Sequence, residues 1–175
     1  MKRFILPVII LILGVGILSQ CEKDDICSES TPTTPKMVIN FYEFLNPSVP
    51  KSVNKIEIFD IENPDVVLVF EAADQIQVPL RTDGDVSKYV FRLHYTNINQ
   101  VLTNEDVIEI KYTTEHIYVS RACGYKSNFS LLESLPFELN PKVTDTAGDE
   151  LWIKEYIVRQ PNIENENETH LDILF

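Results

Sequence analysis

The chain has 175 residues, with 15 basic and 27 acidic side chains, 44% apolar residues, 5 glycines and 10 prolines. This composition excludes collagen-like, disordered and coiled-coil proteins and suits one domain that buries about two-thirds of its unfolded surface. It also argues against nucleic acid as a partner, because phosphate backbones attract basic grooves and a net charge of −12 repels them.

Residues 1–20 have the pattern of a removable lipoprotein signal peptide. Lys2 and Arg3 give a positive start, and the 15 residues from Phe4 to Leu18 are mostly apolar. A bilayer span needs about 20 apolar residues, so a short membrane anchor is only the alternative. The closing Leu18-Ser19-Gln20-Cys21 resembles a bacterial lipobox, with Gln20 where Gly or Ala is usual. We therefore expect lipidation at Cys21 and a mature net charge of 13 minus 27, or −14.

Residues 21–36 are predicted to form a lipidated, flexible tether. They are polar and rich in Ser, Thr and Pro, so they cannot build a core. The tetrapeptide Glu22-Lys23-Asp24-Asp25 resembles the tags that send lipoproteins of certain Gram-negative bacteria to the outer face of the outer membrane, although a solvated leader is equally consistent. We expect an outer membrane lipoprotein, on the periplasmic face or the cell surface, that contacts the membrane through its N-terminal lipid.

The cysteine count supports an exported protein. If Cys21 is acylated, Cys27 and Cys123 are the only possible intrachain pair. A disulfide between them closes a loop of roughly 100 residues, worth about 4 kcal/mol on the chain-entropy model. Two free thiols are the alternative. A metal site is disfavoured because two cysteines 96 positions apart, without a CxxC motif, lack ligand spacing.

From residue 37 to 175 the sequence predicts a single β-sandwich domain. Short runs rich in Val, Ile, Phe and Tyr alternate with period two between Pro, Asn, Asp and Gly. The fold class is therefore all-β, an antiparallel sandwich, Ig-like or related, of about 8–10 strands. The candidate strands are Met37–Leu45, Val53–Asp60, Val66–Phe70, Gln75–Leu80, Ser87–Thr96, Val107–Thr113, His116–Cys123, Phe129–Leu132, Leu151–Val158 and His170–Phe175.

Alternation within these strands predicts which side chains face the core. Tyr89, Phe91, Leu93 and Tyr95 share one face of their strand, as do Ile108, Ile110 and Tyr112 of theirs. Because a slip of one residue turns such a set outward, the register is firmly specified. The same alternation along His116–Cys123 predicts that Cys123 points into the core.

Turn signals predict the connections. A tight link at Thr113-Thr114-Glu115 makes the two flanking strands a hairpin, and Asp83-Gly84 is a second hairpin signal. Pro79 makes its strand an edge strand. The acidic loop Pro161–His170 joins the last two strands as a long hairpin, while Leu131–Leu139 fits an amphipathic helix and a loop equally well.

The sequence contains no recognisable nucleophile or cofactor motif. There is no GxSxG turn, and Cys123 and His116 are expected on opposite sides of one strand. His94, His116 and His170 lack metal-ligand spacing and are predicted on exposed strand faces, although His94 and His116 can still meet across neighbouring strands. We expect no catalytic residue, no metal and no cofactor.

Acidic and aromatic residues leave other chemistries open. Glycosidases use paired carboxylates, for which Glu109, Glu115, Asp149 and Glu150 are candidates. The loops Asp83-Gly84-Asp85 and Asp145–Glu150 offer oxygens to Ca²⁺ but lack EF-hand spacing, so turn chemistry is the simpler interpretation. Exposed aromatics bind glycans by stacking; Tyr118 and Trp152 are the candidates, with core packing favoured for Trp152.

Four parts of the sequence are distinctive: Cys21-Glu22-Lys23-Asp24-Asp25-Ile26-Cys27, Thr31-Pro32-Thr33-Thr34-Pro35 with Val38-Ile39-Asn40-Phe41-Tyr42, Ser120-Arg121-Ala122-Cys123-Gly124-Tyr125-Lys126 and Gln160-Pro161-Asn162-Ile163-Glu164-Asn165. In these parts the sequence resembles a family of small uncharacterised lipoproteins from Gram-negative bacteria, a domain of unknown function. Because the family has no known activity, the resemblance implies no catalytic residue.

Two functions are consistent with these patterns. One is a non-enzymatic envelope module that contacts a protein or a polysaccharide through an edge strand or a loop face. The other is an envelope enzyme that acts on glycans through an unrecognised carboxylate pair. The lack of a recognisable catalytic motif favours the binding module.

Overall fold

The computed structural model describes residues 26–97, 100–140 and 151–175. The chain divides into two compact units. The described part of the hairpin unit comprises residues 26–32 and 118–125, and the sandwich unit comprises the described residues of 33–117 and 126–175. Within the described residues no helix is present, and so none is long and apolar enough to cross a membrane.

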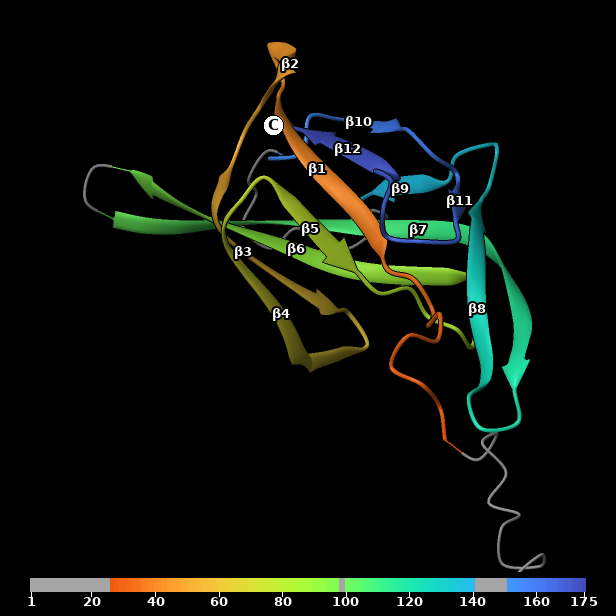
Figure 1. The fold of residues 1–175 in the computed structure, drawn as a ribbon. Helices are drawn as coiled ribbons and strands as arrows, with labels where there is room; N and C mark the ends of the chain where they lie inside the picture. Colours follow the sequence, from red (N-terminus) through yellow and green to blue (C-terminus); the bar gives the residue numbers. More distant parts are fainter. Residues whose placement is uncertain (1–25, 98–99, 141–150) are drawn as a thin grey trace, which may run out of the picture. The chain divides into compact units, whose positions relative to one another are not determined.

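The described strands form two sheets, and the all-β sandwich prediction is confirmed (Figure 1). The first sheet has five strands, in which β1 pairs in parallel with β12 and antiparallel with both β2 and β5, and β10 pairs with β12. These strands are β1 (Met37–Glu43), β2 (Asn46–Pro50), β5 (Gln75–Val78), β10 (Glu155–Val158) and β12 (Leu171–Leu174).

The second sheet has seven strands in the order β11-β8-β7-β6-β3-β4, with β9 also paired to β7. Its strands are β3 (Val53–Asp60), β4 (Asn63–Ala73), β6 (Val86–Asn97), β7 (Gln100–Ser120), β8 (Gly124–Leu131), β9 (Phe137–Leu139) and β11 (Asn162–Ile163). Strands β2, β9 and β11 were not foreseen, because β2 contains two prolines and the other two are at most three residues long.

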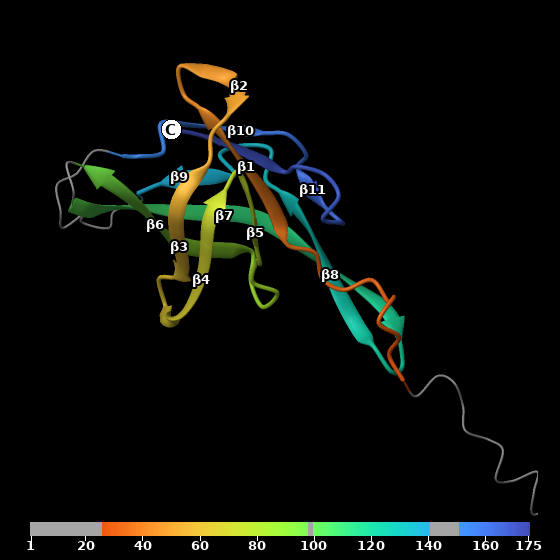
Figure 2. The same ribbon diagram turned by 60° about the vertical axis from the view of Figure 1, so that its left-hand side comes forward.

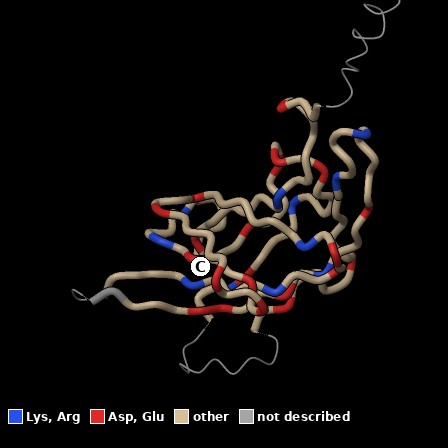
Figure 3. Tube along the Cα trace, turned by 90° about the horizontal axis from the view of Figure 1, so that it is seen from below, with Lys and Arg blue, Asp and Glu red and all other residues tan. Residues whose placement is uncertain are grey.

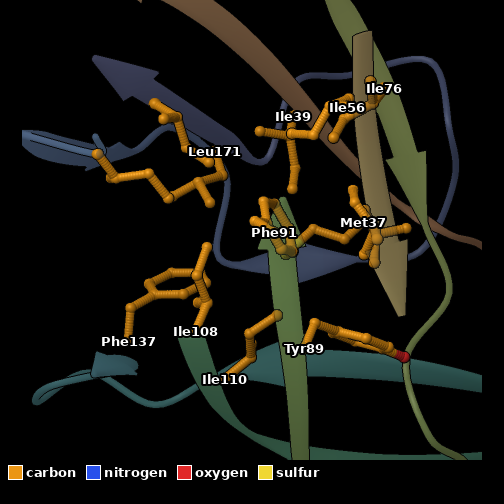
Figure 4. Close-up of a cluster of buried hydrophobic side chains, with 14 of the residues drawn as sticks. Met37, Ile39, Ile56, Ile76, Tyr89, Phe91, Ile108, Ile110, Phe137 and Leu171 are labelled. Carbon is orange, nitrogen blue, oxygen red and sulfur yellow. The ribbon is translucent and has the colours of Figure 1, made fainter. Parts of the chain in front are cut away.

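The core lies between the two sheets and is built by the predicted alternation. Tyr89, Phe91 and Leu93 are buried, as are Ile108, Ile110 and Tyr112, whereas Tyr95 is exposed. Figure 4 shows Ile39 and Leu171 of the first sheet converging on Phe91 and Ile108 of the second. Burying each such side chain contributes about 1.5–3 kcal/mol, so the period-two pattern holds the sheets face to face.

The hairpin predicted at Thr113-Thr114-Glu115 is wrong, because β7 continues through it as one strand of 21 residues. Threonine is β-branched and suits a strand, and no Gly or Asn supplies the positive φ of a tight hairpin turn. The strand ends at Ser120, so Cys123 lies in the turn before β8 and is partly exposed, which also corrects its expected position in the core.

The predicted Asp83-Gly84 hairpin is also wrong. This segment connects β5 of the first sheet to β6 of the second, and Gly84 has no positive φ. Strand β5 ends before Pro79, which has no N–H to donate. Of the strands that the structure describes, β5 pairs with β1 alone, so its edge position is confirmed. The predicted pairing of the last two long strands is confirmed, since β10 and β12 are antiparallel.

Candidate binding edge

Among the described strands, β4 is the terminal strand of the seven-stranded sheet and pairs with β3 only (Figures 1 and 2). Its sequence, with Val66, Val67, Leu68, Val69 and Phe70 in a row, favours a strand because β-branched and aromatic side chains fit a pleated surface. Of these, Val66, Val67 and Val69 are 63%, 40% and 51% exposed. A terminal strand presents unpaired N–H and C=O groups, so β4 is a template for a further strand.

An apolar cavity lies beside this edge. It has a volume of about 200 Å³ and is lined by Ile58, Phe59, Asp60, Asn63, Val66, Leu68, Pro79 and Tyr89. The hydroxyl of Tyr89 donates to the carbonyl of Pro79 over 2.6 Å, and burial raises the pKa of Tyr89 to about 12. The tyrosine therefore stays neutral, and the cavity suits an apolar side chain.

The charges along β4 are acidic. Asp65 and Glu71 flank the apolar run, and the strand has no basic residue. On the neighbouring strand, Lys55 stands opposite Glu71, and its Nζ lies 2.8 Å from Oε1 of Glu57. A partner strand along the free edge of β4 therefore meets two carboxylates separated by five apolar residues.

The outer face of β3 and β6 carries a network of ion pairs centred on Glu57. Oε2 of Glu57 lies 3.0 Å from Nη1 of Arg92 and 3.2 Å from Nε2 of His94. Its pKa is lowered to about 2, first by the hydrogen bond from Lys55 and then by Arg92 and His94. Figure 3 shows acidic and basic positions interspersed along the described part of the chain. A carboxylate held ionised in this way ties β3 to β6 rather than donating protons.

Arg92 extends the same network to β7 and to an aromatic ring. Its Nε donates to Oε1 of Glu105 over 2.6 Å, and its guanidinium lies 4.9 Å from the ring centroid of Phe59. Phe59 stands opposite Val67 of β4, and Glu57 stands opposite Val69. The outer face of β4 is therefore bordered by a rigid, charged surface.

The structure does not gather the three histidines into one site. His94 stands opposite Thr103 and contacts Glu57, whereas the exposed His116 lies thirteen residues further along β7, with Nδ1 2.9 Å from Oγ of Ser127. His170 is fully buried, so its predicted exposure is wrong. The physical reason is a distant contact, because its Nδ1 accepts the N–H of Val38 at the start of the parallel β1–β12 pair.

Of the candidate carboxylates, the two that the structure describes, Glu109 and Glu115, lie six residues apart along β7 and do not form a pair. Glu109 contacts Lys88 at 2.7 Å and Lys111 at 3.5 Å, and these contacts lower its pKa. Glu115 is exposed, and Asp149 and Glu150 lie outside the described residues.

The loops considered for calcium show no cluster of ligands in the described part of the chain. Asp83 pairs with Nε of Arg81 at 3.1 Å, whereas Asp145–Glu150 lies outside the described residues. Within the described ranges no group of three or more His, Cys, Asp or Glu side chains is placed to hold a metal ion.

The two candidate aromatics differ in position. Trp152 is buried and its Nε1 donates to the carbonyl of Phe91 over 3.1 Å, which confirms core packing. Tyr118 is exposed and pairs edge to face with Tyr125, at 5.3 Å between ring centroids. Sequence reasoning missed Tyr125, because nothing in the pattern showed that β8 returns beside the end of β7.

The predicted disulfide between Cys27 and Cys123 is present, with 5.0 Å between the two Cα atoms. Within the same hairpin unit, the N–H of Cys123 donates to Oγ of Ser120 over 3.1 Å, and Gly124 follows with a φ of 70°. The turn requires glycine there because other residues rarely adopt this conformation. Cys21, the expected site of lipidation, lies outside the described residues.

Together these features define a small all-β sandwich with an open apolar edge. The chain belongs to a family of unknown function, DUF6452, whose model matches residues 55–175. Comparisons with curated proteins and with solved structures gave no match.

Proposed function

We propose that this chain is a non-enzymatic, lipid-anchored envelope protein that binds an extended segment of a partner protein as an additional strand along β4. The observation that carries the proposal is the combination of a long terminal strand, three exposed valines and an apolar cavity beside them. In this mode of recognition, main-chain hydrogen bonds give affinity and pockets for alternate side chains give specificity.

The geometry of a sheet describes how such a segment binds. It lies about 4.8 Å from β4 and alternates its side chains between the two faces. On the inner face, one apolar side chain enters the cavity beside Val66 and Leu68. On the outer face, its side chains cover Val67 and Val69.

Charge decides which partner fits. Because Asp65 and Glu71 flank the apolar run, the matching segment has Lys or Arg on both sides of an apolar stretch. A second copy of β4 fits poorly: in antiparallel pairing centred on Leu68, Asp65 of each copy faces Glu71 of the other, and like charges directly opposite are destabilising.

The resemblance of Leu18-Ser19-Gln20-Cys21 to a lipobox supports a location at the membrane. We propose that Cys21 carries the lipid and that the protein is held at the outer membrane, on its periplasmic face or at the cell surface. The partner is then another envelope protein that exposes an extended segment. A polysaccharide partner is an outcome of the experiment below.

Synthetic peptides test the proposed binding mode. The probe is a peptide of ten residues, in which six alternating Val and Thr residues lie between two lysines at each end. Its binding to the folded full chain is measured by fluorescence anisotropy. We expect the peptide to bind, and in NMR spectra of the complex we expect the amide chemical shifts of β4 to change more than those of β2. Methylating alternate backbone nitrogens should abolish it, because strand addition requires main-chain donors. Binding that survives methylation contradicts the proposal, as does stronger binding of a polysaccharide at another face.

Substitutions on β4 supply the matched controls. Val69→Lys should weaken binding of the lysine-flanked peptide about fivefold, because it adds a repelling charge, and Val69→Glu should not weaken it. The control is Val86→Lys, at an exposed valine of β6 outside this edge. Equal effects of Val69→Lys and Val69→Glu would mean that charge at the edge does not select the partner.

A further inference from the structure

Two exposed tyrosines form an aromatic pair in the hairpin unit. Tyr118, near the end of β7, is 59% exposed, and Tyr125, at the start of β8, is 70% exposed. Their rings meet edge to face, and Ile26 of the same unit is exposed as well. Amphipathic aromatic rings of this kind are enriched where an apolar phase meets water.

The disulfide fixes how far this pair can lie from a lipid at Cys21. Cys27 is joined to Cys123, which lies in the turn between Tyr118 and Tyr125. Cys27 lies only six positions after Cys21, so the chain between their Cα atoms reaches about 20 Å at most. Without the disulfide, this limit on the position of the turn is lost.

The charge of the hairpin unit also suits a lipid surface. Among its described residues, Glu29 and Arg121 are the charged ones, and they cancel. The mature chain as a whole has an excess of 14 acidic side chains over basic ones. The described part of the hairpin unit is therefore a surface that headgroups do not repel.

We propose that Tyr118 and Tyr125 rest in the headgroup region of the membrane that holds the lipid anchor, and that the Cys27–Cys123 disulfide keeps them there. This inference rests on the proposed lipidation of Cys21. The partner it commits to is a zwitterionic lipid surface. The disulfide then acts as a positioning device, since it converts a free tether into a short connection to one particular turn.

Surface iodination of tyrosine measures this contact. Acylated protein in vesicles of phosphatidylcholine and phosphatidylethanolamine is iodinated by lactoperoxidase, an enzyme too large to enter the headgroup layer, and each tyrosine is quantified by peptide mass spectrometry. The Cys21→Ala chain with the same vesicles is the reference. We expect iodination of Tyr118 and Tyr125 to fall at least fivefold in the acylated protein, and that of Tyr95, which is also exposed, to change less than twofold.

A longer tether provides the matched variant. Ten Gly and Ser residues inserted after Asp25 keep the disulfide but raise the greatest reach from Cys21 to Cys27 to about 54 Å, so both tyrosines should regain reactivity. The double variant Cys27→Ser with Cys123→Ser should also restore the iodination of both tyrosines. Circular dichroism confirms first that this variant still folds. Unchanged protection with the longer tether overturns the role of the disulfide.

The remaining outcomes separate this inference from the proposed function. An intact mass without acyl chains at Cys21 contradicts the anchor and this inference together. Acylated, vesicle-bound protein with fully reactive Tyr118 and Tyr125 overturns the inference alone. Protection of both tyrosines by a soluble polysaccharide, but not by vesicles, assigns the pair to glycan stacking and overturns the membrane contact.

Discussion

His170 should make the sandwich lose stability as the pH falls below neutrality. Its side chain is fully buried, and its Nδ1 accepts the backbone N–H of Val38 over 2.9 Å. The backbone N–H of His170 donates in turn to the carbonyl of Val38 over 3.0 Å. Protonating Nδ1 places a hydrogen against the N–H of Val38 and puts a charge into the interior. The fold therefore holds this imidazole in its neutral form.

The sign and size of the effect follow from the pKa. Burial lowers the pKa of His170 below its ordinary value of 6.5, while Glu168 and Glu166 act in the opposite direction. The unfolded chain therefore takes up a proton near pH 6.5, and the folded chain takes it up only at lower pH. Stability is present above pH 6.5 and is lost as the pH falls toward the folded pKa, by at most about 1.4 kcal/mol per pH unit.

The variant His170→Gln isolates this contribution. Glutamine is neutral at every pH, and its side-chain oxygen can accept the N–H of Val38. Urea unfolding at pH 7.5, 6.5 and 5.5 gives the free energy of unfolding of both proteins. Between pH 6.5 and 5.5 the wild type should lose up to about 1 kcal/mol more than His170→Gln, whereas the exposed control His116→Gln should follow the wild type. Parallel pH profiles for wild type and His170→Gln would refute the reasoning.

Three substitutions test local packing by urea unfolding. Leu135 is largely exposed with a φ of 49°, so Leu135→Gly should raise the free energy of unfolding by about 0.5–1 kcal/mol, and Leu135→Ala, which keeps the strained backbone, should not. Trp152→Phe removes the donor to the buried carbonyl of Phe91 and should cost about 2 kcal/mol; a loss below about 0.5 kcal/mol would contradict this bond. Arg159→Met leaves the buried carboxylate of Asp172 without the Nε that lies 2.5 Å from it and should cost about 3 kcal/mol, a loss that adding Asp172→Asn should largely reverse.

Local patterning predicted the parts of the fold that local chemistry decides. The strand Val53–Asp60 has the bounds of β3, and Phe91 faces the core because alternation leaves it no other side. The pairing of Cys27 with Cys123 followed from counting cysteines rather than from geometry. Each of these conclusions needed only the near neighbours of a residue or the number of residues of one type.

Three of the errors came from contacts between distant segments. Thr113-Thr114-Glu115 is compatible with a turn and with a strand, and the chain becomes a strand there because β7 continues past β6 to pair with β8. The chain does turn at Asp83-Gly84, as predicted, but the turn connects β5 of one sheet to β6 of the other instead of joining two paired strands. The burial of His170 depends on Val38, which lies 132 positions away. No local signal reports such a partner.

The binding edge was only partly predictable, for the same reason. The apolar run Val66–Phe70 predicted a strand, and an edge strand was among the expected contact surfaces. A continuous apolar run does not show whether its strand is central or terminal in the sheet, since both kinds of strand can have the same sequence pattern. The cavity joins residues of β3, β4 and β6 with Pro79, so it exists only once the sheets are assembled.

The exposed edge of β4 also requires protection from self-association, and we expect its two acidic residues to supply it. Apolar terminal strands pair with copies of themselves unless charges oppose the pairing. In the antiparallel register centred on Leu68, position 65 of each copy faces Glu71 of the other. Asp65→Lys therefore turns two repulsive pairs per dimer into two attractive ones. Within each copy, Glu71 still stands opposite Lys55 of β3. This variant should dimerise near 100 μM in sedimentation equilibrium at low salt. Wild type and Asp65→Asn should remain monomeric, and adding Glu71→Lys should restore the monomer through lysine repulsion. If Asp65→Lys stays monomeric, or if the wild type already dimerises, charge at these two positions does not control what β4 binds.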